Sequence, residues 1–233
     1  MLDMSSVQGS GVFLLLILIS SIPAIAVLVW FRLARYPFSP LRYSVSLLAG
    51  AASFFIALFL QDLFLKYGLF RGTGKWGLFS EIFFRIAFTE ELSRLILLAL
   101  LFLAVRRLFS APDISPVTIA GAAGLIAGLG FAILESSVYG ASNPGNALLR
   151  AFTAAPLHGA CGFRVGCSSI MLFRERPAAA ITRFLTAVII HGTYNFLLLI
   201  PGTLPTAAAV LISLLSLASS AVTIRNGMKG GNA

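Results

Sequence analysis

The sequence predicts an all-α membrane protein, a polytopic bundle of about seven transmembrane helices. Of the 233 residues, 58% are hydrophobic and only 11% are charged, and the mean hydropathy is +0.96. Soluble domains carry about 25% charged residues, so this composition is typical of a chain embedded in a lipid bilayer. Strand-type alternation of apolar and polar residues is absent, which argues against a barrel. The loops are short, so residues 1–233 are expected to form a single transmembrane domain.

Seven apolar stretches are long enough to cross the hydrocarbon core, which takes about 20 residues of helix. In chain order they are Gly11–Phe31, Tyr43–Phe64, Leu78–Val105, Val117–Gly140, Ala147–Phe173, Ala178–Ile200 and Pro205–Ile224. The first has no Lys or Arg before it and is longer than a signal-peptide core, which favours an uncleaved signal anchor. Between the second and third, at about Gln61–Trp76, three glycines favour an irregular outer loop, the longest of the chain.

The basic residues predict the orientation, because Lys and Arg are enriched in cytoplasmic loops. Ten of them follow the first, third, fifth and seventh stretches: Arg32, Arg35, Arg42, Arg106, Arg107, Arg174, Arg176, Arg183, Arg225 and Lys229. Only Lys66, Arg71 and Lys75 lie in the opposite loops. This asymmetry predicts an N-terminus outside, a C-terminus in the cytoplasm and an odd number of spans. The net charge of +9 is dispersed over short loops, so it indicates topology rather than a nucleic-acid partner.

Four of the predicted spans contain ionisable side chains that hydrocarbon should exclude. These residues are Glu90, Glu91, Glu135, His158 and His191. A charge at the bilayer centre costs about 2.5–3.5 kcal/mol, so such residues usually serve a function. Carboxylates and imidazoles suit proton transfer, metal binding and activation of water. Counted from the outer ends of their spans at a rise of about 1.5 Å per residue, all of them could meet in the outer half of the bilayer.

Spacing along single helices predicts some of the partners. Arg94 follows Glu90 by four residues and Glu91 by three, so it can pair with either carboxylate. Adjacent residues point about 100° apart, so only one of the two glutamates can face a given neighbour. His191 and Asn195 share a helix face, so Asn195 could orient the imidazole or bind substrate. Each residue also has a purely structural explanation, such as a neutralised Arg–Glu pair or a histidine bonded to a helix carbonyl.

Small residues in the fourth and fifth spans indicate close packing. Gly124 and Gly128 lie one turn apart and allow a neighbouring helix to approach. Because Glu135 is on the same helix, these glycines could bring its carboxylate into the bundle, and ordinary close packing explains them equally well. Cys161 and Cys167 lie on different faces of one helix, which makes them packing residues rather than a disulfide or a metal pair.

The polar residues occur in four motifs, each on a separate predicted helix, whose order resembles that of a known family. The motifs read EELSR at 90–94, FAILE at 131–135, HGACG at 158–162 and HGTYN at 191–195. Together they resemble the PrsW family of intramembrane proteases, relatives of the CAAX prenyl protease and bacteriocin-processing superfamily. Arg94 stands where PrsW proteins more often have Lys. Glu135 stands where the prenyl-protease branch has His, which favours PrsW.

This resemblance implies a multi-pass protein of the bacterial inner (cytoplasmic) membrane with a catalytic core at about 78–200. It implies an intramembrane endopeptidase whose partner is a single-span membrane protein substrate. Characterised relatives cleave an anti-sigma factor near its extracytoplasmic side, which agrees with a site in the outer half of the bilayer. The identity of the substrate does not transfer from the family.

The predicted reaction is peptide-bond hydrolysis by an activated water, which needs a base and a group that stabilises the developing oxyanion. Glu90 is the predicted general base, and Glu91 is expected to be held by Arg94. In a metal-free form, the two histidines steady the water and the oxyanion, and Asn195 donates a hydrogen bond.

A zinc form of the same site is the alternative. Its ligands would be Glu135, His158 and His191, with a fourth position for water and Glu90 as base. No HExxH pair is present, so spacing within one helix does not support a metal, and the metal-free form is favoured.

A proton-coupled transporter or channel is the rival function, because the same carboxylates and imidazoles could relay protons. The sequence shows no tandem repeat and no paired interrupted helices of the kind found in inverted-repeat transporters. A non-catalytic scaffold is a third possibility, and it would require the polar residues to satisfy one another.

Overall fold

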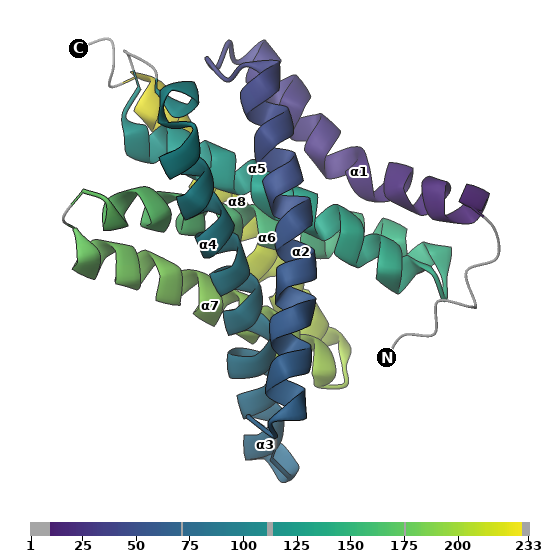
Figure 1. Cartoon of the computed structure of the whole chain (residues 1–233). Helices are drawn as coiled ribbons and strands as arrows, with labels where there is room; N and C mark the ends of the chain where they lie inside the picture. Colours follow the sequence, from purple (N-terminus) through teal and green to yellow (C-terminus); the bar gives the residue numbers. More distant parts are fainter. Residues whose placement is uncertain (1–9, 71, 111–113, 175, 230–233) are drawn as a thin grey trace.

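The computed structural model describes residues 10–70, 72–110, 114–174 and 176–229, and these fold into helices (Figure 1). In chain order they are α1 (Ser10–Leu33), α2 (Pro40–Lys66), α3 (Gly74–Ser80), the π-helix η2 (Glu81–Ala87), α4 (Phe88–Ala104), the 3-10 helix η3 (Arg106–Phe109), α5 (Pro116–Gly140), α6 (Pro144–Leu172), α7 (Pro177–Leu199) and α8 (Thr203–Lys229). All seven predicted stretches lie on helices, and the third is divided among α3, η2 and α4.

Proline and capping residues determine where several helices begin. Four helices have proline in the first turn, where its missing N–H costs nothing: Pro40, Pro116, Pro144 and Pro177. Three of these are preceded by a polar N-cap whose side chain accepts a backbone hydrogen bond of the first turn. The cap residues are Ser39, Ser115 and Asn143.

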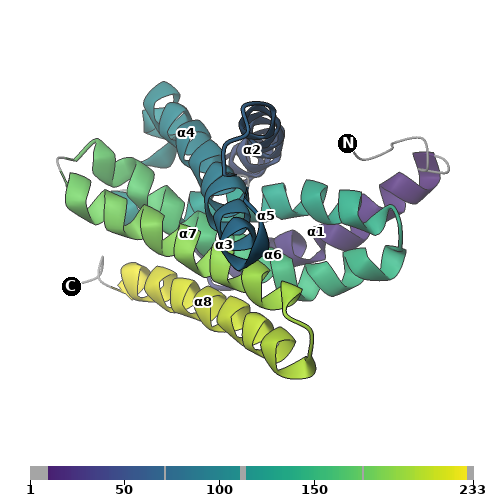
Figure 2. The ribbon, with the colours of Figure 1, turned by 90° about the horizontal axis from the view of Figure 1, so that it is seen from below.

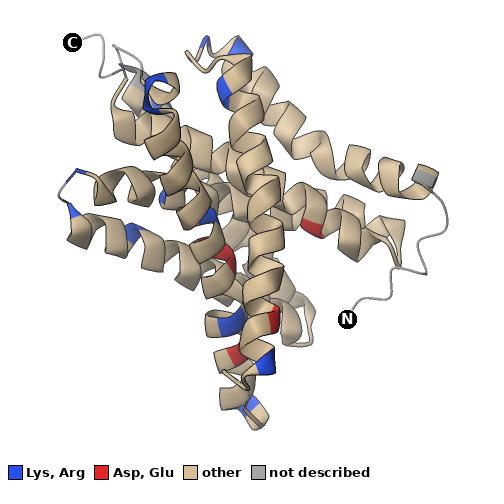
Figure 3. Cartoon of the chain, in the orientation of Figure 1, with Lys and Arg blue, Asp and Glu red and all other residues tan. Residues whose placement is uncertain are grey.

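Among the residues that the structure describes, four helices, α1, α2, α5 and α8, are long and apolar enough to cross a membrane. Large apolar side chains also lie exposed on the outside of the bundle, among them Leu14, Phe59 and Leu215. Outward apolar side chains are suited to contact with lipid tails rather than water. The count of seven spans and the orientation of the termini stay predictions. Figure 3 shows Lys and Arg at several loop ends, and acidic residues from the centre of the view to its lower end.

The helices are arranged around α5 and α6, which share the most extensive helix–helix contact in the described part of the chain. Figure 2 shows α2 and α4 on one side of α5, α6 and α7, with α8 on the other. Helix α1 packs against α5 and α6. The motif-bearing helices α4, α5, α6 and α7 therefore meet in the interior of the bundle.

Helices α5 and α6 approach each other to backbone contact through glycine. A Cβ atom at Gly124 would lie 2.0 Å from the carbonyl oxygen of Gly162, and one at Gly128 would lie 1.9 Å from that of His158. No larger residue fits at this crossing without moving a backbone. The expected close packing is confirmed, and it includes the backbone of a motif histidine, His158.

The predicted outer loop at Gln61–Trp76 is wrong at both ends, because α2 continues to Lys66 and α3 begins at Gly74. Gly68, two residues after the end of α2, has a φ of +68°. The N–H of Gly68 donates to the carbonyl of Leu65 (3.2 Å) and that of Leu69 to the carbonyl of Phe64 (2.8 Å), the pattern of a Schellman motif. The helix is therefore terminated by Gly68 and not by Gln61, the first polar residue, which lies within α2.

Candidate active site

The structure brings all five predicted ionisable residues together in the interior. Glu90 and Glu91 lie in the first turn of α4, Glu135 in α5, His158 in α6 and His191 in α7. Glu91 is fully buried, both histidines are 1% exposed and Glu90 is 5% exposed. Buried charges need partners, so their mutual contacts decide what this cluster can do.

Glu91 is held by a cation from its own helix and by an imidazole from α7. Arg94 Nη1 donates to Glu91 Oε2 at 2.5 Å, and His191 Nδ1 donates to Glu91 Oε1 at 2.8 Å. Of the two pairings that the sequence allowed for Arg94, the structure has the one with Glu91. Nδ1 of His191 carries the hydrogen of this bond, so in the neutral ring Nε2 has the lone pair.

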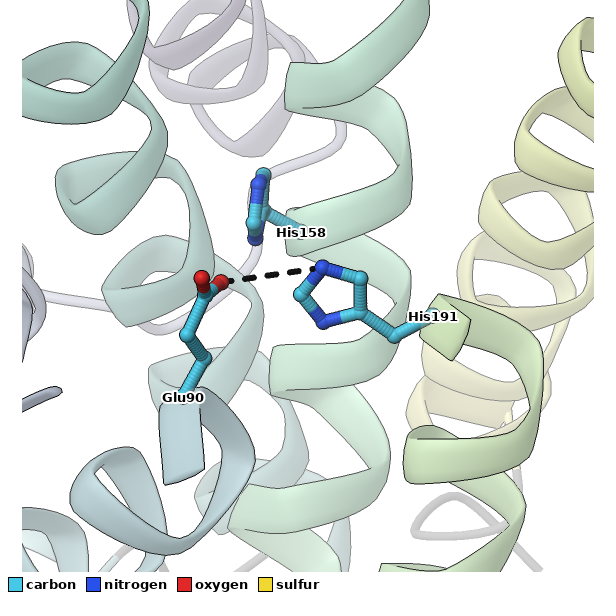
Figure 4. A group of neighbouring side chains, drawn as sticks. All are labelled: Glu90, His158 and His191. Carbon is cyan, nitrogen blue, oxygen red and sulfur yellow. Dashed lines mark ion pairs between the residues drawn. The ribbon is translucent and has the colours of Figure 1, made fainter. Parts of the chain in front are cut away.

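Figure 4 shows the carboxylate of Glu90 facing the Nε2 atom of His191. Glu90 Oε2 lies 3.6 Å from His191 Nε2 and has no hydrogen-bond partner among the described residues, although it is buried. Glu90 Oε1 accepts a hydrogen bond from Gln61 Nε2 at 3.2 Å. A carboxylate oxygen and an imidazole lone pair at this separation are suited to share a water molecule or a cation between them.

His158 is engaged through both ring nitrogens. Arg94 Nη2 lies 3.4 Å from His158 Nδ1, and a guanidinium can only donate, so Nδ1 is an acceptor. Nε2 therefore carries the hydrogen and donates to Glu135 Oε2 at 2.7 Å. The ring also packs against Phe131 and, edge to face, against His191, with centroid distances of 5.1 Å and 4.9 Å.

Glu135 lies at the edge of the cluster and is paired with Arg150 of α6, a residue that the sequence analysis left without a role. Arg150 Nη2 donates to Glu135 Oε2 at 2.5 Å, and its guanidinium lies 4.2 Å from the centroid of the Tyr139 ring. Ser137, two residues beyond Glu135, donates its hydroxyl hydrogen to the carbonyl of Ile133. The sequence offered one indication of the contact between Glu135 and Arg150, because Arg150 is a charged residue at the margin of the predicted span that follows Glu135.

The π-helix η2 connects the site to α7. It directly precedes the glutamates of α4, and its Phe83 packs on α7 next to the motif histidine. A Cβ at Gly192 would lie 2.4 Å from Phe83 Cδ1, so a larger residue there would displace the Phe83 ring. π-helical turns are frequent at functional sites.

The predicted link between Asn195 and His191 is not formed in the described chain, where no hydrogen bond joins the two side chains. Glu91 orients the imidazole instead. Asn195 is half-buried, one helical turn beyond His191, so its amide remains available to a ligand.

A metal-ligand arrangement is present with a different carboxylate from the predicted one. Glu90, His158 and His191 each offer one ligand atom, and these atoms all lie within 4.8 Å of one another. The sequence-based set had Glu135 in place of Glu90. In the structure Glu135 is drawn toward Arg150 and toward the Nε2 hydrogen of His158.

Comparison with protein families shows that residues 40–220 match the model described as PrsW family intramembrane metalloprotease. The match extends beyond the four motifs and includes α2 and most of α8. No match was found among curated proteins or among solved structures.

Proposed function

Because the chain belongs to the PrsW family of intramembrane metalloproteases, we propose that it is an intramembrane endopeptidase that hydrolyses a peptide bond of a membrane-anchored protein. One observation carries the assignment of the site. The buried Oε2 atom of Glu90 has no partner in the described chain and faces the free Nε2 atom of His191 at 3.6 Å. The family match does not favour the alternative, a proton-coupled transporter.

The proposed role of Glu90 is to accept a proton from water held between its carboxylate and His191. A peptide carbonyl is a poor electrophile, so the attacking water must lose a proton as it adds. His191 can accept a hydrogen bond from that water only at Nε2, because Nδ1 is committed to Glu91. Arg94 holds Glu91 in turn, which fixes both the tautomer and the ring orientation.

The residues also fit a metal ion, which the word metalloprotease in the family description implies. Glu90, His158 and His191 would hold the ion, since they combine an unpartnered buried carboxylate oxygen with a free imidazole nitrogen. A bound divalent metal supplies a water that is deprotonated near neutral pH. To bind the ion, His158 would have to give up its hydrogen bond with either Glu135 or Arg94, because each of these occupies one of its ring nitrogens.

We propose a single-span, anti-sigma-factor-like substrate and a location in the bacterial inner membrane. Two of the site residues, Glu135 and His191, lie in the C-terminal parts of α5 and α7, toward the α5–α6 and α7–α8 connections, and His158 lies near the middle of α6. The basic residues predict that these connections are outside. A bond cleaved at this depth would lie in the outer half of the bilayer.

A reconstituted cleavage assay tests the proposal. Purified protein is incubated with a panel of single-span membrane substrates, with and without a chelator, as wild type, Glu90→Gln and His191→Ala. Loss of a general base typically costs about 10²- to 10⁴-fold, so Glu90→Gln is expected to leave almost no product. Glu81→Gln is the control, because Glu81 pairs with Arg85 away from the cluster and is half-exposed.

The outcomes separate the alternatives. Product from wild type and Glu81→Gln alone supports a protease with Glu90 and His191 in its chemistry. Loss of wild-type activity on chelation, restored by one added metal, supports the metal form, and full activity in a metal-free preparation supports Glu90 as sole activator. Equal product from all variants would contradict the assignment of the site.

A further inference from the structure

We infer that Gln61, on α2 and outside all four motifs, is a positioning residue that fixes the Glu90 carboxylate for reaction. The inference rests on the proposed function, because it concerns the group that accepts the proton. Its carrying observation is the hydrogen bond from Gln61 Nε2 to Glu90 Oε1, at 3.2 Å.

The Gln61 hydrogen bond determines which carboxylate oxygen faces His191. The terminal torsion of a glutamate is broad, so the two oxygens of an unrestrained carboxylate exchange freely. With Oε1 bound to Gln61, the plane of the carboxylate is defined and Oε2 points toward His191 Nε2. Glu90 is therefore held from α2 on one side and open to the reacting molecule on the other.

Gln61 is itself held in place by the packing of α2. Gly50, Phe54, Ala57 and Gln61 follow at intervals of four, three and four residues, so they lie along one face of the helix. A Cβ at Gly50 would lie 1.8 Å from the carbonyl oxygen of Ala127 on α5, which leaves no gap between the helices. Phe54 and Ala57 are buried, two turns and one turn before Gln61 respectively.

The same face of α2 contacts the site through Phe131 of α5. Phe54 packs edge to face on Phe131 with a centroid distance of 5.4 Å. The Phe131 ring in turn lies 4.7 Å from the Arg94 guanidinium and 5.1 Å from the His158 ring. The position of Gln61 is thus tied to the residues that orient both histidines.

An amide suits this position chemically. A lysine or arginine would form an ion pair with Glu90 and weaken its affinity for a proton, and an acidic residue would repel it. Glutamine donates a hydrogen bond without adding a charge. It restrains the carboxylate and leaves its charge available for the reaction.

The test separates positioning from stability by measuring kcat and KM for single-span substrate. Gln61→Met keeps the length of the side chain and removes the donor, and Gln61→Glu keeps its shape and opposes Glu90 with a like charge. In both variants we expect kcat to fall about 10-fold or more, which corresponds to the free energy of one hydrogen bond to a charged group. We expect KM to change less than about twofold. Gln61→His, which restores an N–H donor, should recover part of kcat.

Asp62→Asn is the matched control, because Asp62 is the next residue of α2 and is exposed. It should retain wild-type kcat. Wild-type kcat in Gln61→Met would overturn the inference, as would a loss that appears in KM alone. A lowered thermal midpoint with unchanged kcat would mean that Gln61 only stabilises the α2–α4 contact.

A second measurement does not depend on cleavage. Thermal midpoints of Gln61→Met, Glu90→Met and the double variant in detergent form a double-mutant cycle. The hydrogen bond predicts that the double variant shifts by less than the sum of the two single shifts, and additive shifts would overturn the inference. If the wild type cleaves no substrate, the proposed function fails, and this cycle alone decides whether Gln61 restrains Glu90.

Discussion

Arg94 is the cation around which the polar side chains of the site are arranged. It is fully buried, donates to Glu91, lies next to His158 and covers the ring of Phe131. Breaking a buried ion pair leaves the remaining charge uncompensated, which costs more than the pair contributes. Arg94 therefore stabilises the fold and also orients both histidines.

Replacing Arg94 by Met is expected to destabilise the protein by about 3–5 kcal/mol, because Glu91 would keep a buried charge without its cation. Arg94→Lys retains the charge but makes one point of contact in place of two. Its stability should therefore lie between those of the wild type and Arg94→Met. Chemical or thermal unfolding in detergent measures both. Arg85→Met is the control, since the Arg85–Glu81 pair is partly exposed and worth about 0–1 kcal/mol. Equal stability of the two Met variants would contradict this view of Arg94.

The residue contacts also show how far spacing along one helix can predict a site. The pairing of Arg94 with a glutamate follows from a separation of three residues. Gln61 and Arg150 lie 29 and 15 residues from their partners and on other helices, so no local spacing indicates them. Spacing allows Asn195 either to orient His191 or to bind substrate, and in the structure Glu91, 100 residues from His191, orients the imidazole.

At the scale of elements, the crossing of α5 and α6 sets the geometry of the site. The two backbones touch through Gly124, Gly128 and Gly162, and His158 is part of the contact surface. Any added atom here must separate the helices, which would also move His158 away from Glu135. The sequence motif of small residues predicted close packing, and the structure adds that the packing passes through the site.

We expect Gly124→Ala and Gly128→Ala to destabilise the protein by about 1–3 kcal/mol and to lower kcat, because the new methyl group would overlap backbone atoms. Gly159→Ala on the same face of α6 is the control. Its Cβ would lie 3.4 Å from Leu129 Cδ2, a side chain that can move. Unfolding midpoints and cleavage rates of the three variants test this, and equal effects at all three positions would show that backbone contact is not the determining factor.

At the scale of the whole molecule, the predicted orientation assigns the connections between helices to two sides of the membrane. Ser142 lies exposed in the α5–α6 connection, predicted outside, and Ser110 lies exposed after η3, predicted in the cytoplasm. The two native cysteines are buried, so they leave the surface free of reactive thiols.

A membrane-impermeant maleimide tests this orientation in intact cells. Ser142→Cys should be labelled without permeabilisation, and Ser110→Cys only after it. The wild type should remain unlabelled under both conditions, because Cys161 and Cys167 are inaccessible until the protein unfolds. The reverse pattern would place the N-terminus inside and the site in the inner half of the bilayer.

The helical membrane class and the positions of the long helices follow from composition, hydropathy and spacing, which are local properties of the chain, and the family resemblance rests on the residues of the four motifs. The pairing of Arg94 with Glu91, the approach of Glu90 to His191 and the contact of Gln61 with Glu90 are visible only once the helices are packed. The physical reason is that these contacts depend on how closely the helices pack, and backbone contact at glycines on three helices sets that distance.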